Sequence, residues 1–147
     1  MWLEIFNFLH FIGLSFGLGG VTIATIISLK ADKDKDVAKA FIKIMPAMVK
    51  IIWIGLVFLI ISGIALPYFI TWHLDKNMLL VKHVLFIWIV IFGITIGLNS
   101  RKMKKLMIIG EKEKPSLEFL RAKKRAKAFS IVNLILWYLV AIISVFI

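Results

Sequence analysis

The sequence has no cysteine, and among its 147 residues only three are histidine and three are proline. The absence of cysteine excludes disulfides, thiolate metal sites, iron–sulfur clusters and cysteine nucleophiles. Acidic residues are few, eight against nineteen lysines and arginines, and they lie in the connections or at the outer ends of the apolar runs. The chain therefore lacks the intramembrane carboxylate typical of proton-coupled transport. It also lacks the paired carboxylates, glycine-rich phosphate loop and Ser/His/Asp set of soluble enzymes.

Apolar residues dominate the composition instead. They make up 61% of the chain and the mean hydropathy is +0.97, values far outside those of soluble globular domains. Nearly all of them fall in four runs, each long enough for the roughly 20 residues of helix that cross a bilayer core. The first run has no basic n-region and is longer than the apolar part of a signal peptide, so we expect it to be retained. The sequence predicts a single domain, an all-α integral membrane four-helix bundle in a prokaryotic cytoplasmic membrane, with spans at residues 3–29, 41–71, 78–98 and 129–147.

Lysines and arginines concentrate in two of the connections between these runs, residues 30–40 and 99–128. The positive-inside rule places such connections in the cytoplasm, so both chain termini are expected on the outer side. A basic run also occurs in nucleic-acid-binding proteins, but beside a span it is more simply a topology signal. We therefore expect these loops to bind anionic lipid headgroups and expect no nucleic-acid partner.

Two of the three histidines, His10 and His83, fall inside different predicted spans. At about 1.5 Å of rise per residue, both lie roughly 8 to 10 Å below the outer face. An ionisable side chain inside a membrane is costly and is by default a candidate functional residue. His73 lies at the outer end of the second span, beside interfacial aromatic residues, and no role is assigned to it.

A haem b accounts for both intramembrane histidines, because its iron takes an axial ligand on each face and facing helices of a bundle can supply both. His10 and His83 are the predicted axial ligands of one haem, held by each chain or shared in an oligomer. Gly13 and Gly17 share the helical face of His10, and their lack of a side chain would let the flat macrocycle approach the backbone. The alternative for these two glycines is close packing against another helix.

Two polar residues next to the histidines complete the predicted site. Lys82 adjoins His83, and its amine is expected to pair with a haem propionate or another acidic ligand group, the alternative being a side chain that extends to the water interface. Asn7, one turn before His10, is expected to orient the imidazole, the alternative being a capping residue at a wet helix end. Four aromatic residues are expected mostly to pack or to face lipid, with lining of a planar ligand as the alternative: Trp53, Trp88, Trp137 and Tyr138.

A copper site is the rival interpretation, with His10, His83 and Met78 as ligands, since imidazole and thioether both suit Cu(I). Met78 precedes His83 by five residues, which turns it away from the same helical face. The remaining methionines are scattered. We therefore rank copper below haem.

Three short segments carry a resemblance to a known group. They are Phe8 to Gly13, the segment Leu80-Val81-Lys82-His83, and "WIGLVFLIISG" from Trp53 to Gly63. Together they resemble the first three helices of small membrane proteins of the HemJ-type protoporphyrinogen oxidase and CopD-like group. The resemblance implies a haem-binding or porphyrin-handling membrane protein, with His10 the best-matched position and Lys82 the next. After Gly13 the chain departs from the HemJ pattern, which argues against protoporphyrinogen oxidation. A histidine at position 83, directly after Lys82, favours bis-imidazole haem ligation instead.

Two functions follow as hypotheses. The first is a haem b-binding membrane redox protein, cytochrome b-like, that exchanges electrons near the outer face with a quinone, a small oxidant or a porphyrin-like substrate. If it is an enzyme, it is an oxidoreductase of the protoporphyrinogen oxidase-like or cytochrome b-like kind. The second is a non-enzymatic membrane protein, such as a small-molecule or copper permease subunit or a helix-packing partner, with structural histidines. Small-residue faces on the helices leave a homo-oligomer open in either case.

Overall fold

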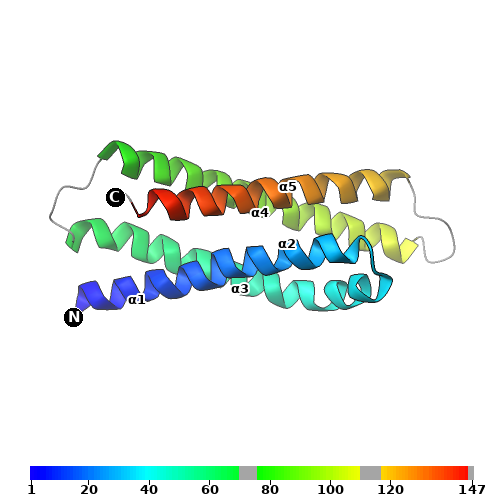
Figure 1. Ribbon diagram of the computed structural model, residues 1–147, viewed down its shortest axis with the longest axis horizontal. Coiled ribbons are helices and arrows are strands. Elements are labelled where there is room, and N and C mark those ends of the chain that lie inside the picture. Colours follow the sequence, from blue (N-terminus) through cyan, green and yellow to red (C-terminus); the bar gives the residue numbers. More distant parts are fainter. Residues whose placement is uncertain (70–75, 110–116, 146–147) are drawn as a thin grey trace. The chain divides into compact units, whose positions relative to one another are not determined.

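The computed structural model describes residues 1–69, 76–109 and 117–145, with the backbone alone described at residues 35 and 103–109 (Figure 1). Four helices are long and apolar enough to cross a membrane: Trp2–Ala31, Asp36–Phe69, Lys76–Lys102 and Leu117–Ile143. The described part of the chain contains no strand. The predicted class, an all-α membrane four-helix bundle, is confirmed.

The elements are α1 (Trp2–Leu14), the π-helix η1 (Ser15–Gly19), α2 (Gly20–Ala31), α3 (Lys35–Phe69), α4 (Lys76–Ile109) and α5 (Leu117–Ile143).

Three helices extend past the apolar runs at the ends predicted to be cytoplasmic. Helix α3 begins at Lys35, before the apolar run at 41; α4 continues to Ile109, past residue 98; and α5 begins at Leu117, before residue 129. Lysine, arginine and alanine are good helix formers, so a helix need not end where hydrocarbon ends. The apolar runs therefore mark the membrane core better than they mark helix boundaries. His73 lies outside the described residues.

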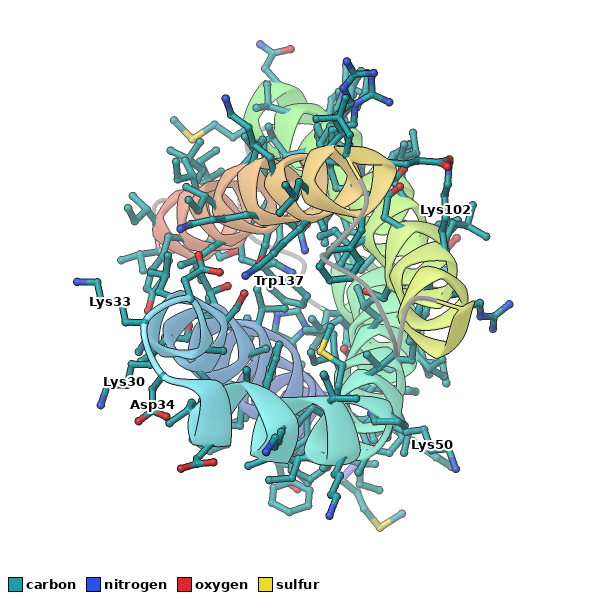
Figure 2. The ribbon with its side chains drawn as sticks, turned by 90° about the vertical axis from the view of Figure 1, so that its right-hand side faces the viewer. Lys30, Lys33, Asp34, Lys50, Lys102 and Trp137 are labelled. Carbon is teal, nitrogen blue, oxygen red and sulfur yellow. The ribbon has the colours of Figure 1, made fainter. Side chains whose placement is uncertain are left out.

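The chain divides into two compact units, the first ending at Leu79 and the second beginning at Leu80. The first unit is built on an antiparallel helical hairpin, in which α1, η1 and α2 form one arm and α3 forms the other (Figure 1). Its turn is short: the backbone N–H of Lys33 donates to the carbonyl of Lys30 at 2.9 Å, and α3 starts two residues later. Lys30, Lys33 and Asp34 lie together at this turn (Figure 2). A connection this short requires neighbouring antiparallel helices.

Asp34 starts α3 by capping it. Its Oδ1 accepts hydrogen bonds from the backbone N–H groups of Asp36 at 2.8 Å and Val37 at 3.3 Å. The first N–H groups of a helix have no partner within the helix, and an aspartate at this position satisfies them. The negative charge also favours the positive end of the helix dipole.

Glycines set the distance between the two arms of the hairpin. A Cβ atom on Gly55 of α3 would lie 2.6 Å from the backbone nitrogen of Gly17 and 2.9 Å from the carbonyl oxygen of Gly13. A Cβ atom on Gly20 would lie 2.7 Å from Cγ1 of Ile52. We call this contact, formed by Gly13, Gly17, Gly20 and Gly55, the glycine seam. Such close approach of backbones is how membrane helices associate when apolar burial supplies no driving force.

Aromatic stacking holds the predicted outer end of the hairpin. The rings of Phe6 and Phe69 stack with centroids 5.5 Å apart, and Trp2 stacks on Phe6 at 6.4 Å. These contacts join the start of α1 to the end of α3. The hairpin is thus fastened at both ends, by the capped turn and by the aromatic stack.

The second unit contains α4 and α5, which also run antiparallel. The rings of Phe92 and Phe129 lie 5.6 Å apart, and Nζ of Lys102 lies 2.7 Å from Oε1 of Glu118. The ion pair is exposed, so it adds little to stability. The buried residues of α5 recur at helical spacing along one face: Ala122, Ala126, Asn133, Trp137 and Val140.

Candidate functional site

His10 of α1 contacts a serine of the opposite arm of the hairpin. Its Nδ1 lies 2.9 Å from Oγ of Ser62, a side chain that is 0% exposed. The Ser62 hydroxyl donates its own proton to the carbonyl of Phe58 at 2.7 Å. While the hydroxyl makes this bond it accepts from His10, and the matching tautomer of a neutral imidazole carries its proton on Nδ1 and its lone pair on Nε2.

The glycine seam is the reason that this hydrogen bond forms. Gly13 and Gly17 follow His10 by three and seven residues, so the three residues share one helical face. On α3, Ser62 follows Gly55 by seven residues and lies on the face that meets the seam. Backbones that approach this closely bring even the short serine side chain within reach of the imidazole. By donating back to the carbonyl four residues earlier, the hydroxyl is satisfied within its own helix, as is common for serine in membrane helices.

Gly13 and Gly17 face α3. A Cβ atom on Gly13 would lie 2.9 Å from Cγ of Leu59 and 3.0 Å from the carbonyl oxygen of Gly55. The space beside these two glycines is thus filled by α3, which is the helix packing given as the alternative to clearance for a macrocycle. We therefore assign Gly13 and Gly17 to the glycine seam.

Asn7 is exposed on α1, and the partner at Nδ1 of His10 is Ser62. Sequence reasoning singled out Asn7 for this orienting role and missed Ser62, which lies 52 residues away. The available signal was a serine inside the otherwise apolar segment "WIGLVFLIISG". A hydroxyl in such a segment has few partners to choose from, but its partner becomes apparent only with the register of the hairpin.

Lys82 and His83 lie on α4, in the second unit. The imidazole of His83 is exposed and Lys82 is half-buried. His83 follows the first residue of α4 by seven positions, and His10 follows the first residue of α1 by eight. The two histidines therefore occupy closely similar positions along their own helices.

Among the residues that the structure describes, no group of three or more histidine, cysteine, aspartate or glutamate side chains is arranged to hold a metal ion. Zinc and other ions bound entirely by protein need such a group. A haem needs only one or two axial ligands, because the porphyrin supplies the other four. The small number of candidate ligands among the described residues is therefore compatible with haem.

The four aromatic residues considered for a planar ligand separate into two kinds. Trp53, Trp88 and Tyr138 are 37%, 49% and 45% exposed, as expected for side chains that face lipid. Trp137 is 1% exposed and is the largest fully buried side chain. Of these four side chains, Trp137 alone is buried.

An apolar groove of about 410 Å³ runs beside η1. Ser15 is the polar residue of its lining, and the Ser15 hydroxyl donates to the carbonyl of Phe11 at 2.9 Å. Hydrocarbon chains suit such a surface, whereas a charged ligand would find no counter-charge on it. The other residues that line the groove are Phe16, Gly19, Gly20, Ile23, Ile27, Ile44, Met48 and Ile51.

Comparisons of the chain with protein-family models, with curated proteins and with solved structures give no significant match. The resemblance to the HemJ-type protoporphyrinogen oxidase and CopD-like group stays a prediction. A functional proposal consequently rests on the residues themselves, and above all on the environment of His10.

Proposed function

We propose that the protein binds one haem b within the membrane and that His10 is an axial ligand of its iron. The hydrogen bond from His10 to Ser62 carries this proposal. Histidines that ligate metals donate their other ring N–H to a fixed acceptor, which sets the tautomer and the ring orientation. With the proton on Nδ1, the lone pair that iron requires is on Nε2.

His83 is the proposed second axial ligand. Its support is the similar position of the two histidines along α1 and α4 and the exposure of its imidazole. Lys82 precedes it, and a half-buried ammonium near the interface suits a haem propionate. Two imidazole ligands and one cation would then hold the cofactor, without the porphyrin clearance first expected at Gly13 and Gly17.

The proposed activity is electron exchange near the outer face of a prokaryotic cytoplasmic membrane, with a quinone, a small oxidant or a porphyrin-like substrate. Bound haem b supplies a one-electron carrier. The protein's own residues would hold the iron through His10 and hold the imidazole through Ser62, which is buried on α3. An apolar environment of this kind is one of the means by which a protein sets a haem potential.

The test is a reduced-minus-oxidised visible spectrum of protein purified after expression with ample haem. Six-coordinate low-spin haem is expected to give sharp reduced bands, and His10→Ala and His83→Ala are each expected to abolish them. His73→Ala is the matched control and should retain the bands. A colourless wild-type protein, or full haem content in both variants, would refute the proposal.

The hydrogen bond between His10 and Ser62 also favours a second candidate, a non-enzymatic membrane protein in which the histidine is structural. In that case the hydrogen bond serves to satisfy the polar groups of His10 and Ser62 where the two helices meet. His10→Asn separates the candidates, because its amide N–H can still donate to Ser62 while it has no ring nitrogen that could ligate iron in place of Nε2. The haem proposal expects His10→Asn to lose the cofactor. The structural alternative expects a colourless wild-type protein and a variant of unchanged stability.

A further inference from the structure

The apolar groove beside η1 lies entirely within the first unit, between the two arms of the hairpin. Its lining residues run from Ser15 to Ile27 on one arm and from Ile44 to Ile51 on the other. At 1.5 Å of rise per residue, Ser15 and Ile27 are about 18 Å apart along the helix. Half of a bilayer hydrocarbon core is about 15 Å thick. The groove is therefore about as long as one leaflet is deep.

The groove is open and suits hydrocarbon. Ile23 and Ile44, on its two walls, are 53% and 51% exposed. No charged side chain lines it, and the one hydroxyl in its lining, that of Ser15, already donates to the carbonyl of Phe11. A ligand that needs hydrogen bonds would lose them here, whereas an acyl chain needs none.

Gly19 lines this groove and takes no part in the glycine seam. A Cβ atom on the next residue, Gly20, would lie 2.7 Å from Ile52. A Cβ atom on Gly19 would meet no described atom within 4 Å beyond its chain neighbours and the nearby helix backbone. Contact between the arms therefore does not require glycine at position 19, and glycine destabilises a helix relative to alanine. What Gly19 contributes is free space in the groove.

A lysine lies at the end of the groove nearest the turn. Lys30 follows Ile23 by seven residues and Ile27 by three, so it shares the helical face that lines the groove. It lies roughly 4.5 Å beyond Ile27 along α2. The side chain is exposed and extends outward from the hairpin (Figure 2). An ammonium group thus lies where the headgroup of a lipid would be if its acyl chain occupied the groove.

The three aspartates at the turn do not share this position. Asp34 caps α3. Asp32 follows Ile27 by five residues, which turns it away from the face that lines the groove. Asp36 lies roughly 12 Å beyond Ile44 along α3, past the end of the groove. The charge at the groove's end is therefore that of Lys30.

We propose that the groove binds one acyl chain of an anionic phospholipid from the leaflet on the side of the turn, with Lys30 paired to the lipid phosphate. A volume of about 410 Å³ accommodates one chain, while the second chain remains in bulk lipid. Basic connections attract anionic lipids in general, whereas the groove holds one molecule in one position. The site does not depend on haem.

The experiment titrates the full chain in detergent with phosphatidylglycerol or with phosphatidylcholine of identical acyl chains, and native mass spectrometry measures the first lipid bound. One lysine near a headgroup should make the anionic lipid bind about fivefold more tightly. Lys30→Gln should remove this preference and leave the affinity for phosphatidylcholine unchanged. The matched control is Lys39→Gln, because Lys39 is exposed and precedes Ile44 by five residues, on another face of α3. It should bind like the wild type.

The groove itself is tested by Gly19→Leu, whose side chain would occupy the free space. Saturable binding of both lipids should be lost. Gly63→Leu is the matched control, because an added Cβ at Gly63 likewise meets no described atom within 4 Å and Gly63 lies outside the groove. If Gly19→Leu does not fold, Lys30→Gln carries the test, since it changes only an exposed side chain.

Equal affinity of the wild type for the two lipids would overturn the proposal, as would a preference that survives in Lys30→Gln or unchanged binding in Gly19→Leu. If Gly19→Leu instead changes the oligomeric state and keeps its lipid, a second copy of the chain covers the groove and the proposal is wrong. His10→Ala separates this site from the proposed haem site, because it should lose haem and keep the lipid.

Discussion

Nδ1 of His10 and Oγ of Ser62 are hydrogen-bonded across the glycine seam, with 2.9 Å between the two atoms. While the Ser62 hydroxyl donates to the carbonyl of Phe58, this bond selects the tautomer of His10 with its proton on Nδ1. It also depends on the close contact between the two arms of the hairpin, because Gly13, Gly17 and Gly55 leave no side chain between the two backbones. The packing of the two arms therefore positions the side chains of the candidate site. Substitution of Ser62 tests the hydrogen bond, and substitution of Gly55 tests the packing.

Ser62→Ala removes the hydrogen-bond partner of His10 and leaves the proposed iron ligand in place. Loss of such an orienting partner typically weakens metal affinity about 10- to 100-fold. We expect Ser62→Ala to bind haem more weakly by that factor, measured by haem titration of the apoprotein. Ser144→Ala is the control, because Ser144 donates to the carbonyl of Val140 in the same way but directly follows the end of α5. Unchanged affinity in Ser62→Ala would show that the hydrogen bond does not support ligation.

Gly55→Ala should separate the arms of the hairpin. The added Cβ would lie 2.6 Å from the backbone nitrogen of Gly17, and backbone cannot move aside as a flexible side chain can. Overpacking of this kind costs about 1–3 kcal/mol. We expect a lower unfolding temperature in detergent. At Gly63, on the same helix, an added Cβ would meet no described atom within 4 Å beyond its chain neighbours and the nearby backbone of α3, so Gly63→Ala should be neutral or slightly stabilising. Equal behaviour of the two variants would contradict the packing described for the seam.

Asp34→Ala should destabilise the start of α3. The substitution leaves the backbone N–H groups of Asp36 and Val37 without the carboxylate that accepts their hydrogen bonds. Loss of an N-cap costs about 1 kcal/mol, so the unfolding temperature should fall by a few degrees. Asp34→Ser should restore most of the stability, since a serine hydroxyl caps the same groups. If serine rescues no better than alanine, capping is not what Asp34 contributes.

Orientation can be tested with single cysteines, because the chain contains none. The basic turn between α2 and α3 is predicted to be cytoplasmic, and the end of α5 is predicted to be outside. A membrane-impermeant maleimide added to intact cells should label Ser144→Cys and should not label Asp34→Cys until the cells are opened. The reverse pattern would invert the topology and place both histidines near the cytoplasmic face.

Much of the fold could be predicted from hydropathy because a membrane imposes it. Hydrocarbon offers no partner for backbone groups, so a long apolar run must form a helix, and four such runs form four helices. Helical periodicity also predicted correctly that Gly13 and Gly17 share a face with His10. These inferences need only distances along one helix. The ends of the helices were less predictable, since α3 already begins at Lys35 among charged residues that are themselves good helix formers.

The sequence by itself thus determined the class, the number of spans and the residues that share each helical face, because these depend on local periodicity and solvent. Only the tertiary structure decided what covers those faces. It placed α3 against Gly13 and Gly17, left Gly19 open in an apolar groove, and brought Ser62 to His10. Which helix meets which face depends on the register between helices, and the register results from side-chain packing between segments far apart in the chain.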